Sequence, residues 1–325
     1  MQSSAEPDIA SEPRAKTRLQ RVDIARGIAL IAMAIYHFSW DLEFFGYLAP
    51  ATTEHGAWKL FARCIASSFL FLVGFSLVLA HGRGIRWRPM LIRLVQIAVA
   101  AAAITAVTMY ITPDSYIFFG ILHEIALASL LGLLFLRLPA PLTLAVAALV
   151  IAAPLFARSE IFDHRILGFV GLATVTPRSN DYVPLFPWFG AVLIGIAAAR
   201  ILQYSGRMGA LAGGTRPQAL QRPLTFIGRH SLAFYLIHQP VLIGLVWLAV
   251  QIAPPDRRPA FEQSCVASCE QQGSEAMCRQ FCGCVVKELD KAKLFDDVFS
   301  GKANQQNNKT VQGIVQMCSP VPDGQ

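Results

Sequence analysis

The sequence predicts an all-α membrane protein: a polytopic bundle of about seven spanning helices, followed by a small disulfide-stapled helical domain. Three observations support this fold class. Hydrophobic residues make up 54% of the 325 residues and charged residues only 15%, against roughly 25% in soluble domains. The apolar residues gather in long runs separated by short basic stretches. Six of the seven cysteines lie beyond residue 264.

The chain begins with a polar segment. Residues 1–17 contain prolines, small residues and charges but lack the apolar stretch of a signal peptide. We expect a disordered cytoplasmic leader there. The net charge of +7 is divided among short stretches between apolar runs, which is typical of contact with lipid headgroups. We therefore expect membrane lipids as partners, and no nucleic acid.

The apolar runs predict the spans. A bilayer core needs roughly 20 apolar residues per helix, and lipid cannot satisfy an open backbone. The fifth run is short and is bounded by Pro141 and Pro154. The expected spans cover residues 24–48, 60–80, 91–112, 116–136, 139–157, 184–203 and 227–251. Together they form a transmembrane domain over residues 18–252. Glycines within the spans permit close contact between helices.

The basic residues predict the orientation. With the N-terminus inside, the inner segments hold fourteen Lys and Arg residues and the outer loops hold five. Such a positive-inside bias predicts a cytoplasmic N-terminus in a bacterial inner membrane. An odd number of spans then places residues 253–325 in the periplasm.

Cysteine spacing in the tail supports an oxidising compartment. Two pairs at i,i+4 spacing flank the turn signal Gly273-Ser274, so two short helices would turn the pairs toward each other. A zinc site is the alternative, but the tail contains no histidine. The expected disulfides are Cys265–Cys282, Cys269–Cys278 and Cys284–Cys318. We expect the tail to be a stapled cap or a partner-binding domain without chemistry of its own.

The first span carries an unusual number of ionisable residues, and such residues within a membrane indicate function. Arg26 and His37 are eleven positions apart, which returns them to nearly the same helix face about 16 Å apart along the axis. Asp41 follows His37 by one turn and could accept a hydrogen bond from its imidazole. The full set is Asp23, Arg26, His37, Asp41 and Glu43.

Two further histidines lie within expected spans. His123 falls early in the fourth span and His238 midway along the seventh, at a depth similar to that of His37. Single histidines in helices are often packing residues. Three at one depth could also bind haem or a metal, although the spacing does not require it.

Four segments in order resemble the bacterial relatives of heparan-α-glucosaminide N-acetyltransferase, an integral-membrane acyltransferase family. The resemblance covers residues 18–252. It is carried by RVDIARGIALIAMAIYHFSWDLEFFG, FFGILHEIALASLLGLLF, YVPLFPWFGAVLIGIAAAR and FIGRHSLAFYLIHQPVLIG. The spacing of Arg26 and His37 also resembles the signature of membrane acyltransferases that modify bacterial polysaccharides.

The resemblance implies transfer of an acetyl or short acyl group from cytoplasmic acetyl-CoA to an amine or hydroxyl of an envelope sugar or related acceptor outside. It implies that His37 is the catalytic histidine and Arg26 its partner, with Asp41 beside it. Coenzyme A is anionic, so arginines are candidates to hold its phosphates. We expect Arg26, Arg88, Arg93 and Arg229 in that role, and Arg86 is a further candidate. Glu43, His123 and His238 are expected to bind the acceptor.

Three other classes remain open, one of them a structural scaffold for a partner complex with the tail as its contact surface. A transporter would also use buried ionisable residues, but no block repeats between the halves of the chain. A haem- or metal-binding membrane protein would use His37, His123 and His238. For the acyltransferase we expect acetyl-CoA as co-substrate and no metal.

Overall fold

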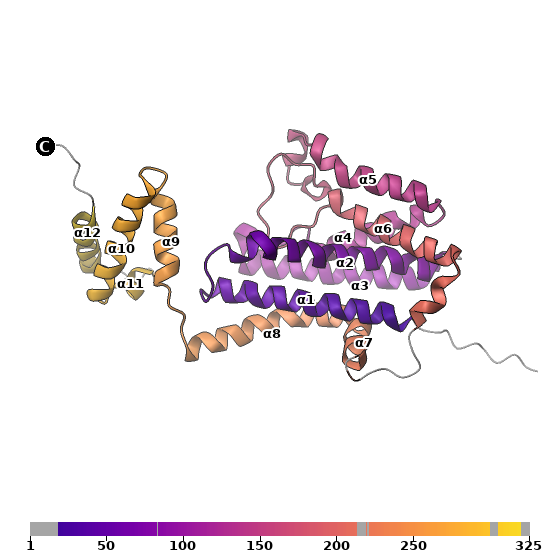
Figure 1. Ribbon diagram of the computed structural model, residues 1–325, viewed down its shortest axis with the longest axis horizontal. Helices are drawn as coiled ribbons and strands as arrows, with labels where there is room; N and C mark the ends of the chain where they lie inside the picture. The colour runs from indigo at the N-terminus through magenta and orange to yellow at the C-terminus, as the bar shows by residue number, and fades with distance from the viewer. Residues whose placement is uncertain (1–18, 83, 213–218, 220, 300–304, 320–325) are drawn as a thin grey trace, which may run out of the picture. The chain divides into compact units, whose positions relative to one another are not determined.

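The computed structural model describes residues 19–82, 84–212, 219, 221–299 and 305–319. The expected leader over residues 1–17 lies outside these ranges. Within them, all regular structure is helical, as the sequence predicts (Figure 1). Short 3-10 turns join the helices at η1 (Thr52–Glu54), η2 (Pro113–Ser115), η3 (Glu160–Asp163), η4 (Gly168–Val170) and η5 (Arg207–Ala212).

The described residues include an apolar helix for each of the seven expected spans. Five are long and apolar enough to cross a membrane. These are α1 (Gln20–Phe44), α2 (Gly56–His81), α3 (Trp87–Ile111), α6 (Leu185–Tyr204) and α8 (Ser231–Ile252). The other two, α4 (Ile121–Phe135) and α5 (Ala140–Phe156), have 15 and 17 residues. The chain is therefore a helical membrane protein, and α4 and α5 are shorter than the expected length of a span.

Two helices begin four or five residues later than the sequence predicts. The apolar run from residue 116 suggests a helix, but α4 begins only at Ile121, because Gly120 is extended and Asp181 accepts a hydrogen bond from the Ile121 N–H at 2.8 Å. The seventh span begins at Ser231 rather than 227, because a separate helix, α7 (Gln221–Arg229), precedes it. A distant carboxylate and a helix break set these boundaries, and neither is visible in the hydropathy.

The chain divides into two compact units. Unit 1 comprises residues 1–34 and 60–238, and unit 2 comprises residues 35–59 and 239–325. The division passes through α1 and α8, so each of these helices contributes to both units. The domain boundary expected at residue 252 stays a prediction; α8 ends at Ile252, within unit 2.

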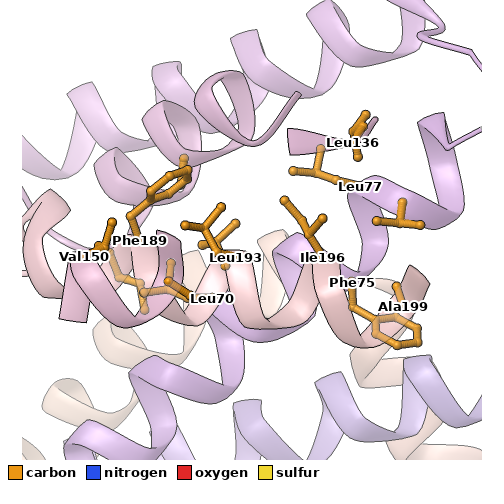
Figure 2. Close-up of a cluster of buried hydrophobic side chains, with 14 of the residues drawn as sticks. Leu70, Phe75, Leu77, Leu136, Val150, Phe189, Leu193, Ile196 and Ala199 are labelled. Carbon is orange, nitrogen blue, oxygen red and sulfur yellow. The ribbon is translucent and has the colours of Figure 1, made fainter. Parts of the chain in front are cut away.

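The core of unit 1 surrounds α6. Side chains from α2, α5 and α6 interleave with Leu136 at the end of α4 (Figure 2). The backbones of α2 and α6 approach so closely that a Cβ on Gly74 would overlap the carbonyl of Val192, and one on Gly195 that of Phe71. Glycine at both positions therefore permits this crossing, as expected for small residues between membrane helices.

The C-terminal part of unit 2 is a set of short helices: α9 (Arg258–Cys269), α10 (Glu275–Lys291), α11 (Phe295–Phe299) and α12 (Gln305–Cys318). Ser274 caps α10 by accepting a hydrogen bond from the Met277 N–H, so the hairpin turn lies where Gly273-Ser274 indicates. A small apolar core surrounds Leu289, which is 1% exposed. The disulfides are Cys265–Cys282, Cys269–Cys278 and Cys284–Cys318, the three pairs expected from the spacing.

Candidate functional site

A cavity of about 210 Å³ lies in unit 1 between α2, α3 and α4. His81, Arg86 and Arg93 line it where the chain passes from α2 into α3, while Val73 and Ile97 line its far part. The turn is held by hydrogen bonds, since the Arg86 N–H donates to His81 Nδ1 at 3.2 Å and Arg86 Nε donates to the Ala80 carbonyl at 3.1 Å. A cationic end followed by an apolar wall suits a ligand with an anionic head and a long chain.

A polar network adjoins this cavity. Arg26 on α1 donates to Asp23 Oδ1 at 3.1 Å and to Ser76 Oγ at 2.5 Å, and Ser76 lines the cavity. Arg229 of α7 lies 3.6 Å from the other oxygen of the buried Asp23. Arg26 is also close enough to Arg93 for their positive charges to repel. One carboxylate stands among several guanidinium groups, so the region carries excess positive charge.

The packing of α7 on α1 explains why Arg229 reaches Asp23. A Cβ on Gly228 would overlap the Asp23 carbonyl, and one on Gly27 that of Leu224, so both helices need glycine at the contact. Of the arginines expected to bind the donor, Arg93 lines the cavity and Arg26 contacts its wall through Ser76. Arg88 is exposed and is not among the residues that line the cavity.

His37 lies on the part of α1 that belongs to unit 2. Its ring is half-buried and meets Tyr36 edge-on, with centroids 5.9 Å apart. The Tyr36 hydroxyl donates to the carbonyl of Thr53 at 3.4 Å. Because α1 is helical from Gln20 to Phe44, Arg26 and His37 occupy one uninterrupted helix at the spacing that the sequence predicts.

The two acidic residues after His37 have defined partners within unit 2. Asp41 is fully buried, and its Oδ1 accepts a hydrogen bond from Gln239 Nε2 of α8 at 2.7 Å. Glu43 accepts from the backbone N–H of Thr53 at 2.8 Å, which ties the η1 turn to α1. In this conformation Glu43 holds the η1 turn against α1, and Asp41 links α1 to Gln239 of α8.

Both ring nitrogens of His123 are engaged in unit 1. Nδ1 accepts from the Gly120 N–H at 3.2 Å, which leaves the proton on Nε2 to donate to Thr105 Oγ1 at 3.2 Å. Thr105 in turn donates to the Ile117 carbonyl at 2.7 Å. The ring therefore fixes the extended segment before α4.

His238 is 8% exposed. Its Nδ1 donates to the Tyr235 carbonyl at 2.7 Å, and its ring stacks on Phe234. In the described ranges, no three His, Cys, Asp or Glu side chains form a group that could hold a metal ion.

The loop between α5 and α6 contains two engaged carboxylates. Burial raises the pKa of Asp181 to about 6, although the hydrogen bond from the Ile121 N–H works in the opposite direction. Asp163 accepts hydrogen bonds from the hydroxyl and the N–H of Thr174 and closes its loop. Both carboxylates thus serve the loop and the start of α4 in this structure.

Sequence reasoning missed several polar groups that the fold brings to these sites. Ser76, His81, Thr53 and Gln239 belong to the networks above, and each lies in or beside an apolar run where its polarity could have been noticed. Glu124 directly follows His123 and is fully buried. Both of its carboxyl oxygens lack a hydrogen-bond partner among the described residues.

Comparison with family models gives the decisive observation. The family described as heparan-alpha-glucosaminide N-acetyltransferase, catalytic, matches residues 18–240. The chain belongs to this family. Membership makes it a membrane acyltransferase, and acetyl-CoA is the co-substrate that the family suggests in general. Comparison with curated proteins and with solved structures gave no match. The matched segment contains α1 to α7, the cationic cavity, His37 and Asp41.

Proposed function

We propose that this acyltransferase moves an acetyl or short acyl group from cytoplasmic acyl-CoA to an amine or hydroxyl of an envelope sugar or related acceptor outside a bacterial inner membrane. The observation that carries the proposal is the cavity lined by His81, Arg86 and Arg93, with Arg26 at its wall, inside the family-matched segment. The positive-inside bias supports a cytoplasmic position for this end of unit 1.

The donor site would use the positive charges. The phosphates of the donor would bind the guanidinium groups of Arg86 and Arg93, with Arg26 and Arg229 adding to the local field. The apolar lining beyond them would receive the pantetheine arm. Arg88, exposed outside the cavity, would contribute only through long-range attraction.

The acyl transfer would take place at His37. As general base, the imidazole takes the proton of the acceptor amine or hydroxyl while that atom attacks the thioester carbonyl, and the thiolate of coenzyme A leaves. In a two-step route, the imidazole itself attacks the thioester and then passes the acyl group to the acceptor. Asp41 would support His37, and Glu43 would shape the acceptor side. Within unit 1, His123 and His238 would act as positioning residues, given their hydrogen bonds to the protein backbone.

The test uses membrane vesicles that contain the full chain, supplied with acetyl-CoA carrying a labelled acetyl group. Labelled envelope material should appear with the wild type and should be lost with His37→Ala at equal protein level. His164→Ala, at an exposed histidine in the loop between α5 and α6, serves as the matched control. Wild-type transfer by His37→Ala would refute the proposed chemistry, and acid-labile label on wild-type protein would favour the two-step route.

The proposed sidedness has its own test. A reporter enzyme that is active only in the periplasm, fused after residue 325, should be active, and the same reporter fused after Phe135 should be silent. The reverse pattern would overturn the orientation.

A further inference from the structure

Three buried polar atoms in unit 2 have no hydrogen-bond partner among the described residues: Asp41 Oδ2, Gln239 Oε1 and Thr53 Oγ1. Asp41 is 0% exposed and Thr53 1%. Leaving one such group unpaired costs about 1–3 kcal/mol, and native proteins seldom tolerate it without a reason. Two of them, Asp41 Oδ2 and Gln239 Oε1, belong to side chains joined by a hydrogen bond, so this pair offers two acceptors to a polar group from outside the chain.

The geometry fixes the kind of group that is missing. Gln239 uses its amide nitrogen to donate to Asp41 Oδ1 at 2.7 Å, so its own oxygen and Asp41 Oδ2 are both left as acceptors. The missing partner must therefore supply N–H or O–H donors. An amine or a hydroxyl does so, whereas a phosphate or carboxylate would be repelled by Asp41.

Thr53 is held from two sides. Its N–H donates to Glu43 and its carbonyl accepts from Tyr36, which fixes the backbone of η1 next to the second half of α1. The Thr53 hydroxyl is then oriented by the turn rather than by a hydrogen bond of its own. It can donate or accept, so it complements a group of mixed character such as a sugar hydroxyl.

We infer that Gln239 helps to bind the acceptor: it holds Asp41 in place, so that Asp41 Oδ2 and the Gln239 amide oxygen together receive the amine or hydroxyl that is to be acylated. This inference rests on the proposed function. It adds Gln239, an uncharged residue that the sequence analysis did not select. Gln239 holds Asp41 from α8, and the carboxylate lies one turn beyond His37 on α1.

The first test is Gln239→Leu in the full chain, with Gln251→Leu as the matched control. Gln251 lies on the same helix but is exposed. Its side-chain amide donates to the Trp247 carbonyl of its own helix at 3.4 Å. We expect Gln239→Leu to raise KM for the acceptor about tenfold or more while KM for acetyl-CoA stays within about twofold. Gln251→Leu should change neither.

The second test exchanges the two groups. Gln239→Glu places two carboxyls side by side and should weaken acceptor binding, and Asp41→Asn should do the same by removing the charge. The double variant Asp41→Asn with Gln239→Glu restores one amide and one carboxylate in contact. It should recover acceptor KM relative to either single variant, which a mere packing role for Gln239 would not produce.

The outcomes separate the two proposals. No acetyl transfer by the wild type would overturn the proposed function. Normal wild-type transfer with unchanged acceptor KM in Gln239→Leu, or no recovery in the double variant, would overturn the role of Gln239 and leave the function standing. If Gln239→Leu fails to fold, the role of Gln239 is tested by Asp41→Asn, Gln239→Glu and the double variant, because these side chains keep the size of the originals.

Discussion

Arg88 and Arg93 lie five positions apart on α3 and differ in what they face. Both side chains are exposed, but Arg93 lines the cationic cavity near Arg26 and Arg88 does not. Both looked equivalent in the sequence, because a basic residue near the end of a span serves topology whether or not it binds a ligand. Only the position of the cavity separates them.

We predict that Arg93→Gln raises KM for acetyl-CoA about 10- to 100-fold, because a charge-assisted hydrogen bond contributes about 1.5–3 kcal/mol. Arg88→Gln should raise it far less. Initial rates at varied acetyl-CoA and fixed acceptor measure both variants. Equal effects of the two substitutions would mean that the cavity does not hold the phosphates.

Asp163 acts on a single loop. The hydrogen bond from the Thr174 hydroxyl, together with backbone N–H groups of Thr174 and Val175, holds the pKa of Asp163 below its usual value. The order that it gives the loop is therefore present above the ordinary carboxyl pKa of about 3.9 and is lost as pH falls through the lowered value.

We predict that Asp163→Asn at neutral pH speeds amide hydrogen exchange at Thr174 and Val175 several-fold, since the amide is a weaker acceptor than the carboxylate. Glu160→Gln, in the same η3 turn, is the control. Unchanged protection at both amides in Asp163→Asn would show that the loop is held by other contacts.

At the scale of elements, α2 and α6 meet through two glycines. The contact is reciprocal, because Gly74 faces the backbone of α6 and Gly195 faces that of α2. Hydropathy predicted both helices, and the glycines on them are visible in the sequence. It could not indicate which helices meet, since lipid provides no hydrophobic driving force that pairs particular faces.

We predict that Gly74→Ala and Gly195→Ala each lower the stability of the purified protein by about 1–3 kcal/mol, because an added methyl forces two backbones apart. Gly244→Ala on α8 is the control, since a Cβ there meets nothing within 4 Å. Thermal unfolding in detergent measures all three. A stable Gly74→Ala variant would contradict the close crossing.

At the scale of the whole molecule, three disulfides stabilise the small helical tail. The cysteines of Cys284–Cys318 are 34 positions apart and those of Cys269–Cys278 are 9 apart. In the loop-entropy description, the longer loop gives about 4 kcal/mol and the shorter about 2.5 kcal/mol.

We predict that replacing Cys284 and Cys318 by serine destabilises the tail more than replacing Cys269 and Cys278. Exchange of the buried Leu289 amide reports the stability of the tail in each variant. Cys64→Ser, at an exposed free cysteine of α2, should leave that exchange unchanged. A larger effect from the shorter loop would mean that packing around α9 and α10 outweighs loop closure.

The sequence by itself determined the fold class, the approximate spans, the cysteine pairing and the family. Each of these depends on local composition or on spacing along one helix. Arg26, His37 and Asp41 could be selected because all three lie on α1, where a fixed rise and rotation per residue relate them.

Tertiary structure alone decided which polar groups meet. Ser76 reaches Arg26 across 50 positions, Asp181 caps α4 across 60, and Gln239 holds Asp41 across 198. Such contacts depend on how helices pack, and packing is set by the shapes of whole faces rather than by any local pattern. The start of α4 and the cation-lined cavity follow from the same cause.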